Sequence, residues 1–232
     1  MIDHYDWAGG REAMMRFGPA DGPVVVPALP LFEEANRTRT FAVGMLRKLA
    51  ERGIGSVLPD LPGTGESLVL LRDVTVLRMR EAFAAVVDHL DRPTIAVGIR
   101  SGTLIDALAL ASGRWHLAPT TGEAVIRELV RIKNAEGGGE RYDVHTIIGV
   151  DEPVEIAGNA LSGEMLADLL CCSPFDRPGS PRRVVRLETD PRPADRKVPG
   201  GPLWRRAEPG DDPALAEMLA DDLAAWVRQC VG

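Results

Sequence analysis

Arg100 and Ser101 stand between two glycines, in the stretch Gly98-Ile99-Arg100-Ser101-Gly102, at the end of an expected strand. A serine hydroxyl can act as a nucleophile when a histidine within hydrogen-bond reach takes its proton. A guanidinium instead binds carboxylates and phosphates through paired hydrogen bonds. Because the positive end of a following helix disfavours a cation, Arg100 calls for an anionic partner. The stretch therefore indicates either nucleophilic chemistry at Ser101 or an anion beside Arg100.

The composition limits the classes of function that the chain can have. The 232 residues carry a net charge of −7, and the arginines are scattered, which argues against a surface for nucleic acid. We expect no membrane span, because there is no long apolar run, and the N-terminus does not resemble a signal peptide. The odd number of cysteines indicates reduced thiols and hence a cytoplasmic protein. The three cysteines lack metal-ligand spacing, and no nucleotide-binding glycine motif is present. We therefore expect no metal and no cofactor.

Strand-like and helix-like segments alternate along the chain, which is typical of a parallel sheet with helices on both faces. The expected strands cover residues 23–29, 55–59, 94–98, 115–117, 144–150, 154–156, 183–187 and 203–207. The expected helices cover residues 35–52, 76–90, 102–111, 123–133, 164–170 and 213–231. Residues 134–140 include three consecutive glycines and are expected to form a loop.

Two stretches resemble the α/β-hydrolases. Residues 98–102 are similar to their G-x-S-x-G turn between strand and helix, with Arg100 at the nucleophile's position and Ser101 one residue later. Residues 60–67, after an expected strand, resemble their D-x-x-G-x-G-x-S turn. The resemblance implies the α/β class, with a mostly parallel sheet flanked by helices. It also implies a single domain over residues 1–232, with a reduced cap inserted at about 119–180.

Four stretches resemble a narrower group, the type 2 hydrolases associated with the exosortase A system. Residues 30–39 are similar to the P-P-F-x-E-E-x-N-x-x-R segment of that group, and residues 98–102 to its G-L-R-x-G turn. Residues 155–161 resemble its E-x-A-G-x-x-L segment, and residues 202–209 its P-F-W…E-P ending. Those proteins are encoded beside bacterial protein-sorting and exopolysaccharide genes, so the resemblance implies a role in such a system.

The α/β-hydrolase resemblance also implies where a catalytic histidine should stand, which is after the last strand. No histidine follows Trp204. The chain's other histidines are expected to be structural, whereas His116, on the strand after the turn, could approach the site. Ser101 is expected to cap the following helix. A nucleophilic role for Ser101 remains the alternative, although the residue after the apex points away from it.

The resemblance further implies which groups surround Arg100. Leu31, Glu33 and Glu34 stand in the loop region where this fold forms its oxyanion hole, and Asp190 stands near the position of the triad acid. In one interpretation, a buried pair between Arg100 and a carboxylate replaces a lost active site. In the other, Arg100 and the helix N-terminus hold a carboxylate or phosphate ligand.

Asn36 and Arg37 open the first helix beside this region. They are either solvated helix residues or part of the pocket.

Two functions remain open. The first is a hydrolase of esters, thioesters or amides in a bacterial exopolysaccharide or protein-sorting system, with an altered site around Arg100, Ser101, Glu33 and Glu34. The second is a catalytically silent protein that binds an anionic small molecule or an acyl carrier.

Overall fold

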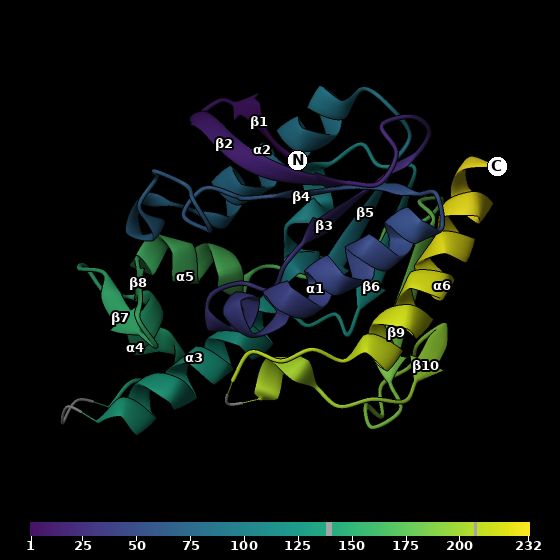
Figure 1. Cartoon of the computed structure of the whole chain (residues 1–232). Coiled ribbons are helices and arrows are strands. Elements are labelled where there is room, and N and C mark those ends of the chain that lie inside the picture. The colour runs from purple at the N-terminus through teal and green to yellow at the C-terminus, as the bar shows by residue number, and fades with distance from the viewer. Residues whose placement is uncertain (138–140, 207) are drawn as a thin grey trace.

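A twisted sheet of eight strands forms the centre of the computed structural model, which describes residues 1–137, 141–206 and 208–232 (Figure 1). The strand order is β1-β2-β4-β3-β5-β6-β9-β10. The strands are β1 (Ile2–Trp7), β2 (Gly10–Phe17), β3 (Val24–Ala28), β4 (Gly55–Pro59), β5 (Thr94–Ile99), β6 (Gly113–Leu117), β9 (Arg182–Leu187) and β10 (Arg196–Val198). β1 and β2 are antiparallel, β2 is antiparallel to β4, and every pair from β4 to β10 is parallel.

The central strands β3, β4, β5 and β6 are buried along their whole length. Strands covered on both faces tend to read as apolar runs, as β3 and β5 do, whereas β6 also buries Arg114 and His116. Alternate residues of β3 face opposite sides, so Val24 and Val26 pack in one half of the core and Val25 in the other.

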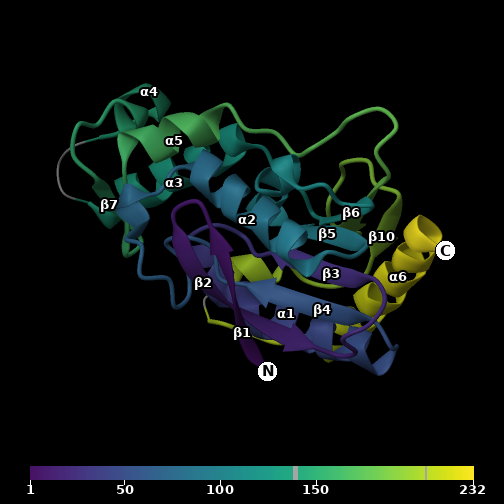
Figure 2. The ribbon, with the colours of Figure 1, turned by 90° about the horizontal axis from the view of Figure 1, so that it is seen from above.

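Helices cover both faces of this sheet (Figure 2). The helices α1 (Glu33–Glu51) and α6 (Pro213–Val231) pack together on one face, where Phe41 and Met45 of α1 meet Leu219 of α6. On the other face α2 (Val76–Leu90) buries Met79 and Val86. The predicted class, a mostly parallel sheet flanked by helices, is confirmed.

A second group of elements lies between β6 and β9 in the sequence and gathers at one side of the molecule (Figures 1 and 2). It consists of α3 (Gly122–Glu136), α4 (Val144–Ile148), β7 (Val154–Ile156), β8 (Asn159–Leu161) and α5 (Gly163–Leu170). β7 and β8 form their own antiparallel pair. This group falls within the predicted cap at about 119–180; that it acts as a cap, and that the chain is one domain, remain proposals.

Three predicted elements differ from the observed ones. Instead of a helix over residues 102–111, two short 3-10 helices follow β5, namely η2 (Arg100–Leu104) and η3 (Asp106–Leu108). Residues 144–148 are helical rather than extended, because Asp143 and Thr146 form a capping box. The predicted strand over 203–207 contains instead the 3-10 helix η4 (Leu203–Arg205), and residue 207 lies outside the described residues.

Other element boundaries differ less from the predicted ones. The predicted loop over residues 134–140 begins later, since α3 continues to Glu136, and residues 138–140 lie outside the described residues. A further 3-10 helix, η1 (Leu71–Asp73), precedes α2. Among the described helices, none has the length and apolar character needed to cross a membrane.

Candidate active site

The chain turns sharply where β5 ends, and Arg100 occupies the turn with a φ of 55°, in the left-handed region. Both flanking glycines are required by close packing. A Cβ on Gly98 would lie 2.7 Å from the Cα atom of Thr103, and a Cβ on Gly102 would lie 2.2 Å from the carbonyl oxygen of Ala28. Such distances leave no room for a side chain. The end of β5 thus packs closely against η2, and η2 packs against the end of β3, which holds Arg100 at the carboxyl end of the sheet.

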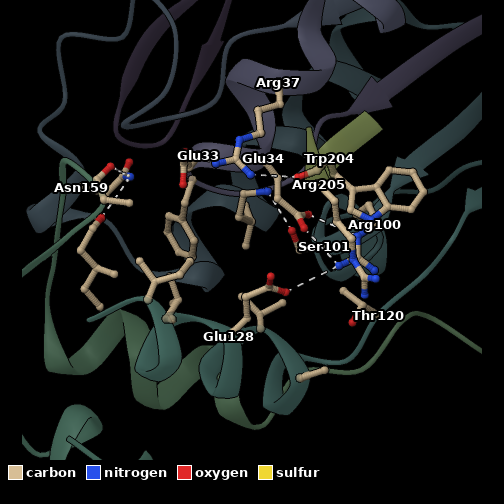
Figure 3. A pocket seen from close by; sticks show the side chains of 18 of the residues that line it. Glu33, Glu34, Arg37, Arg100, Ser101, Thr120, Glu128, Asn159, Trp204 and Arg205 are labelled. Atoms are coloured by element: carbon tan, nitrogen blue, oxygen red, sulfur yellow. Dashed lines mark hydrogen bonds and ion pairs between the residues drawn. The ribbon is translucent and has the colours of Figure 1, made fainter. Parts of the chain in front are cut away.

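Glu34 is the carboxylate that pairs with Arg100 (Figure 3). Nη2 and Nε of Arg100 donate to the two carboxylate oxygens at 3.1 and 3.3 Å. The Arg100 side chain is 10% exposed and that of Glu34 is 21% exposed. The guanidinium also lies over the indole of Trp204, 5.0 Å from its centre, which adds a cation–π contact.

Burial raises the pKa of Glu34 above its usual value, and the charge and hydrogen bonds of Arg100 oppose that rise. A second carboxylate, that of Glu128 on α3, approaches Nη2 of Arg100 to 4.0 Å. Glu128 also pairs with Arg131 at 3.2 Å. The Arg100 charge is therefore neutralised mainly from α1, with a weaker contribution from α3.

Of the three carboxylates that the sequence offered as partners of Arg100, Asp190 forms no ion pair with it among the described contacts. It accepts hydrogen bonds from Arg192 and, at 2.9 Å, from Arg186. The hydrogen bonds from Arg192 are the largest of the causes that hold the pKa of Asp190 well below its usual range. Because both arginines lie within four residues of Asp190, its oxygens are satisfied locally and do not reach toward Arg100.

Ser101 is buried, and its hydroxyl oxygen accepts a hydrogen bond from the backbone N–H of Leu31 at 2.8 Å. Leu31 belongs to the loop after β3, whose N–H groups were expected to face an oxyanion. The Ser101 side chain occupies that donor. The expected cap on a following helix is absent from the described contacts, because η2 has no side-chain cap.

His116 does not line the site, contrary to the suggestion that it could approach it. Its Nε2 atom lies 2.7 Å from Oδ2 of Asp106, and both side chains are fully buried. Among the residues that the structure describes, no histidine lines the cavity beside Arg100. Ser101 therefore has no imidazole base in this arrangement.

A cavity of about 230 Å³ opens beside Arg100 (Figure 3). Its polar wall comes from α1 and the turn, where Glu33 pairs with Arg37 and Arg37 donates to the carbonyl oxygen of Trp204 at 3.2 Å. The opposite wall is apolar and is formed by side chains of α3 and β7, namely Val125, Leu129, Ile132 and Ile156. The cavity therefore suits a ligand with one polar and one apolar part.

The cavity gathers most of the predicted site residues. Those that line it are Leu31, Glu33, Glu34, Arg37, Arg100 and Ser101. Asn36 faces instead a neighbouring hollow, which it lines together with Arg39. Arg39 pairs there with Asp60, at 3.2 Å.

Sequence reasoning missed Glu128, Arg205 and Asn159, which also line the cavity. Glu128 could have been found, because it stands three residues after Val125 and four before Ile132, on an otherwise apolar helix face. A charge on such a face is an informative exception. Among the described residues, no group of three or more histidine, cysteine or acidic side chains could hold a metal ion.

The four stretches that carry the narrower resemblance meet at this cavity although they are far apart in the sequence. The lining residues are Leu31, Phe32, Glu33, Glu34 and Arg37 from the first stretch, Arg100 and Ser101 from the second, Ile156, Ala157 and Asn159 from the third, and Trp204 and Arg205 from the fourth.

No family model and no curated protein matches the sequence. Solved structures, in contrast, are similar over the whole chain. Est1E from Butyrivibrio proteoclasticus has a TM-score of 0.66 at 17% identity, with 99% of this chain and 98% of that chain covered. A thermophilic esterase from Thermogutta terrifontis has a TM-score of 0.57 at 16% identity, with both chains fully covered. A haloalkane dehalogenase variant from Bradyrhizobium elkanii has a TM-score of 0.61 at 12% identity, covering 99% and 97%.

The chain thus has the α/β-hydrolase fold. At these identities the likeness extends to the fold and leaves the reaction open, since the similar proteins include both an esterase and a dehalogenase. The chemistry has to be argued from the cavity.

Proposed function

We propose that this chain is a hydrolase that cleaves an ester, thioester or amide bond of a small molecule held beside Arg100, without a serine nucleophile. The observation that carries the proposal is the Arg100–Glu34 pair at the carboxyl end of β5, facing the cavity. In this proposal Arg100 takes the position that a nucleophile has in other proteins of this fold, and its left-handed φ supports that assignment.

Glu34 supplies the base in this mechanism. The oxygen of a water molecule attacks the acyl carbon, and its proton passes to the Glu34 carboxylate. The bond to the leaving group then breaks, and the leaving group takes the proton back from Glu34. Burial raises the pKa of Glu34 and so makes its carboxylate a stronger base than an exposed one.

Arg100 supplies the electrostatic part. Its Nη1 atom donates no hydrogen bond among the described contacts, so its N–H groups can face a carbonyl oxygen that becomes an oxyanion. The apolar wall on α3 holds the acyl part of the substrate.

We further propose that this hydrolase works in the cytoplasm of a bacterium, in an exopolysaccharide or protein-sorting system. Support comes from the narrower sequence resemblance, whose four stretches contribute residues to one cavity. The three cysteines are free, which fits a reducing compartment.

A second candidate function is a silent protein that binds an anionic small molecule or an acyl carrier in the same cavity. The hydrogen bond from the Leu31 N–H to Ser101 favours it, because a donor that would stabilise an oxyanion is already engaged. The lack of a histidine among the described residues of the cavity points the same way.

Two measurements decide between these functions. The first is hydrolysis of p-nitrophenyl esters and acyl thioesters of increasing chain length by the wild type, Glu34→Gln and the control Glu123→Gln, which changes an exposed carboxylate of α3. We expect turnover in the wild type and the control and at least a hundredfold loss in Glu34→Gln. Equal rates in Glu34→Gln and wild type would contradict the role of Glu34, and no turnover in any protein would favour the binding function.

The second measurement is the intact mass after exposure to a fluorophosphonate probe, with Ser101→Ala as the comparison. We expect no adduct on the wild type. An adduct that disappears in Ser101→Ala would make Ser101 a nucleophile and would overturn the proposed mechanism.

A further inference from the structure

A second cavity, of about 320 Å³, adjoins the first. The two share four lining residues, Arg100, Arg192, Trp204 and Arg205. The second is bounded further by Thr189 and Asp190 from the segment after β9 and by Pro202. A ligand in the first cavity can therefore extend past Trp204 into the second.

Positive charge exceeds negative charge around this second cavity. Arg100 is matched by Glu34, whereas Arg186 and Arg192 share the single carboxylate of Asp190. Burial is the largest cause that lowers the pKa of Arg186; the charges of Arg192 and Arg100 also lower it, while the hydrogen bond and the charge of Asp190 oppose the shift. The excess stands out in a chain whose net charge is −7.

Among the arginines that line the two cavities, Arg205 has the most N–H donors without a partner in the described contacts. Its side chain makes no hydrogen bond or ion pair with any part of the chain that the structure describes, and the residue is exposed. Arg192, in contrast, uses Nε and Nη2 on Asp190 and one Nη1 donor on the carbonyl oxygen of Pro119 at 3.4 Å. Five N–H donors of Arg205 thus remain available at the rim common to both cavities.

We propose that Arg205, assisted by Arg192, binds a carboxylate or phosphate group at one end of the ligand whose apolar part lies in the first cavity. The inference rests on the proposed function only in taking the first cavity as the ligand site. It makes Arg205 the anion receptor instead of Arg100, because Arg100 is already paired with Glu34. The ligand class is then an acidic amphiphile with a short acyl or alkyl chain.

Calorimetric titration with octyl phosphate, octanoate and octanol tests this assignment without requiring turnover. The proteins are the wild type, Arg205→Ala, Arg205→Glu and the control Arg206→Ala. Arg206 is the exposed neighbour of Arg205, and it lines neither cavity. Arg205 has no partner among the described residues, so both of its variants are expected to fold.

We expect octyl phosphate or octanoate to bind the wild type at least about tenfold more tightly than octanol, since one charged hydrogen-bonded contact is worth about that factor. Whichever anion binds more tightly identifies the group. Arg205→Ala should reduce that preference about tenfold, and Arg205→Glu should reduce it further, whereas Arg206→Ala should keep it. Added salt should weaken the binding of the two anions and leave the affinity for octanol unchanged.

Equal affinity for octanol and both anions, or an unchanged anion affinity in Arg205→Glu, would overturn the anion site. That failure is distinguishable from failure of the proposed function. Loss of anion affinity in Arg205→Glu supports the site even if no ester is hydrolysed. Conversely, if the protein hydrolyses neutral esters but binds the anions no more tightly than octanol, the proposed function is supported and the anion site is contradicted.

Discussion

Replacing Arg100 by methionine tests whether the Arg100–Glu34 pair holds this region together. Methionine keeps an unbranched side chain over Trp204 and removes the charge, so Glu34 is left without its main partner. Breaking a buried ion pair costs roughly 3–5 kcal/mol. Because Glu34 is 21% exposed and can take up a proton, we expect about 3 kcal/mol, at the lower end of that range. For a chain of this length, that corresponds to a fall in Tm of about 6–12 °C.

The loss of stability in Arg100→Met should increase as the pH rises. Burial already raises the pKa of Glu34 above 4.5, and removal of Arg100 raises it further. A carboxyl group with a raised pKa binds its proton more tightly in the folded state, so stability falls as pH rises from 4.5 through the folded-state pKa. The destabilisation by Arg100→Met should therefore be smaller at about pH 4, where Glu34 is protonated more fully, than near neutral pH, and it should grow as the pH rises through the folded-state pKa.

The assay is urea unfolding of the wild type, Arg100→Met, Glu34→Leu and the double variant at both pH values. In the double variant neither charge of this pair remains, so it should be more stable than Arg100→Met, with a coupling free energy of about 1–3 kcal/mol. A Tm of Arg100→Met within about 2 °C of the wild type at neutral pH would refute the reasoning, because it corresponds to under about 1 kcal/mol. Additive effects in the double variant would also refute it.

Three further perturbations follow from the contacts. Ser101→Ala should lower the free energy of unfolding by about 1–3 kcal/mol, measured in urea, because the buried N–H of Leu31 loses its acceptor; an unchanged value would show that this N–H finds another partner. Burial alone would raise the pKa of Asp222, but hydrogen bonds from Arg183, Trp115 and Arg196 lower it to about 2. Its stabilisation is thus present above pH 3.8 and lost as the pH falls toward 2. Asp222→Asn should cost about 2 kcal/mol at neutral pH and flatten the acid part of the stability curve, and an unaltered acid limb in thermal melts would contradict this. His116→Ala should cost about 1–3 kcal/mol by removing the hydrogen bond to the buried Asp106, which then keeps, among the described contacts, only its ion pair with Arg114 at 3.6 Å, without changing ligand affinity or turnover. A selective loss of activity in a folded variant would place His116 in the site after all.

The sequence alone predicted the centre of the fold well. The strands β3, β4 and β5 read as apolar runs because both of their faces are covered, and the helices α1, α2 and α6 show apolar residues at helical spacing. The antiparallel pair β1–β2 was not predicted. The segments Ile2–Trp7 and Gly10–Phe17 show neither strict alternation of apolar and polar residues nor a continuous apolar run. The pair is positioned by contacts with α2 and with β4, which lie further along the chain.

The 3-10 helices after β5 could also not be predicted from the sequence. Their residues suit an α-helix, but Arg114 on β6 donates hydrogen bonds to the carbonyl oxygens of Asp106 and Ala109, at 3.0 and 2.8 Å. The Asp106 carbonyl oxygen also accepts the backbone N–H of Ala109 at 3.2 Å, so this oxygen is shared between the 3-10 turn and the Arg114 side chain of β6. Such long-range competition for a backbone oxygen leaves no local pattern.

At the candidate site, the sequence determined that Arg100 needs an anion, because its charge, the flanking glycines and the strand before it are all local features. Only the tertiary structure decided that Glu34 is that partner. Glu33 and Glu34 are neighbours on α1, so their side chains point about 100° apart, and one faces Arg37 while the other faces Arg100. Asp190 is satisfied by arginines of its own segment. Which carboxylate meets a buried cation depends on helix rotation and chain crossing, and these are fixed by the packing of the whole core rather than by residue types.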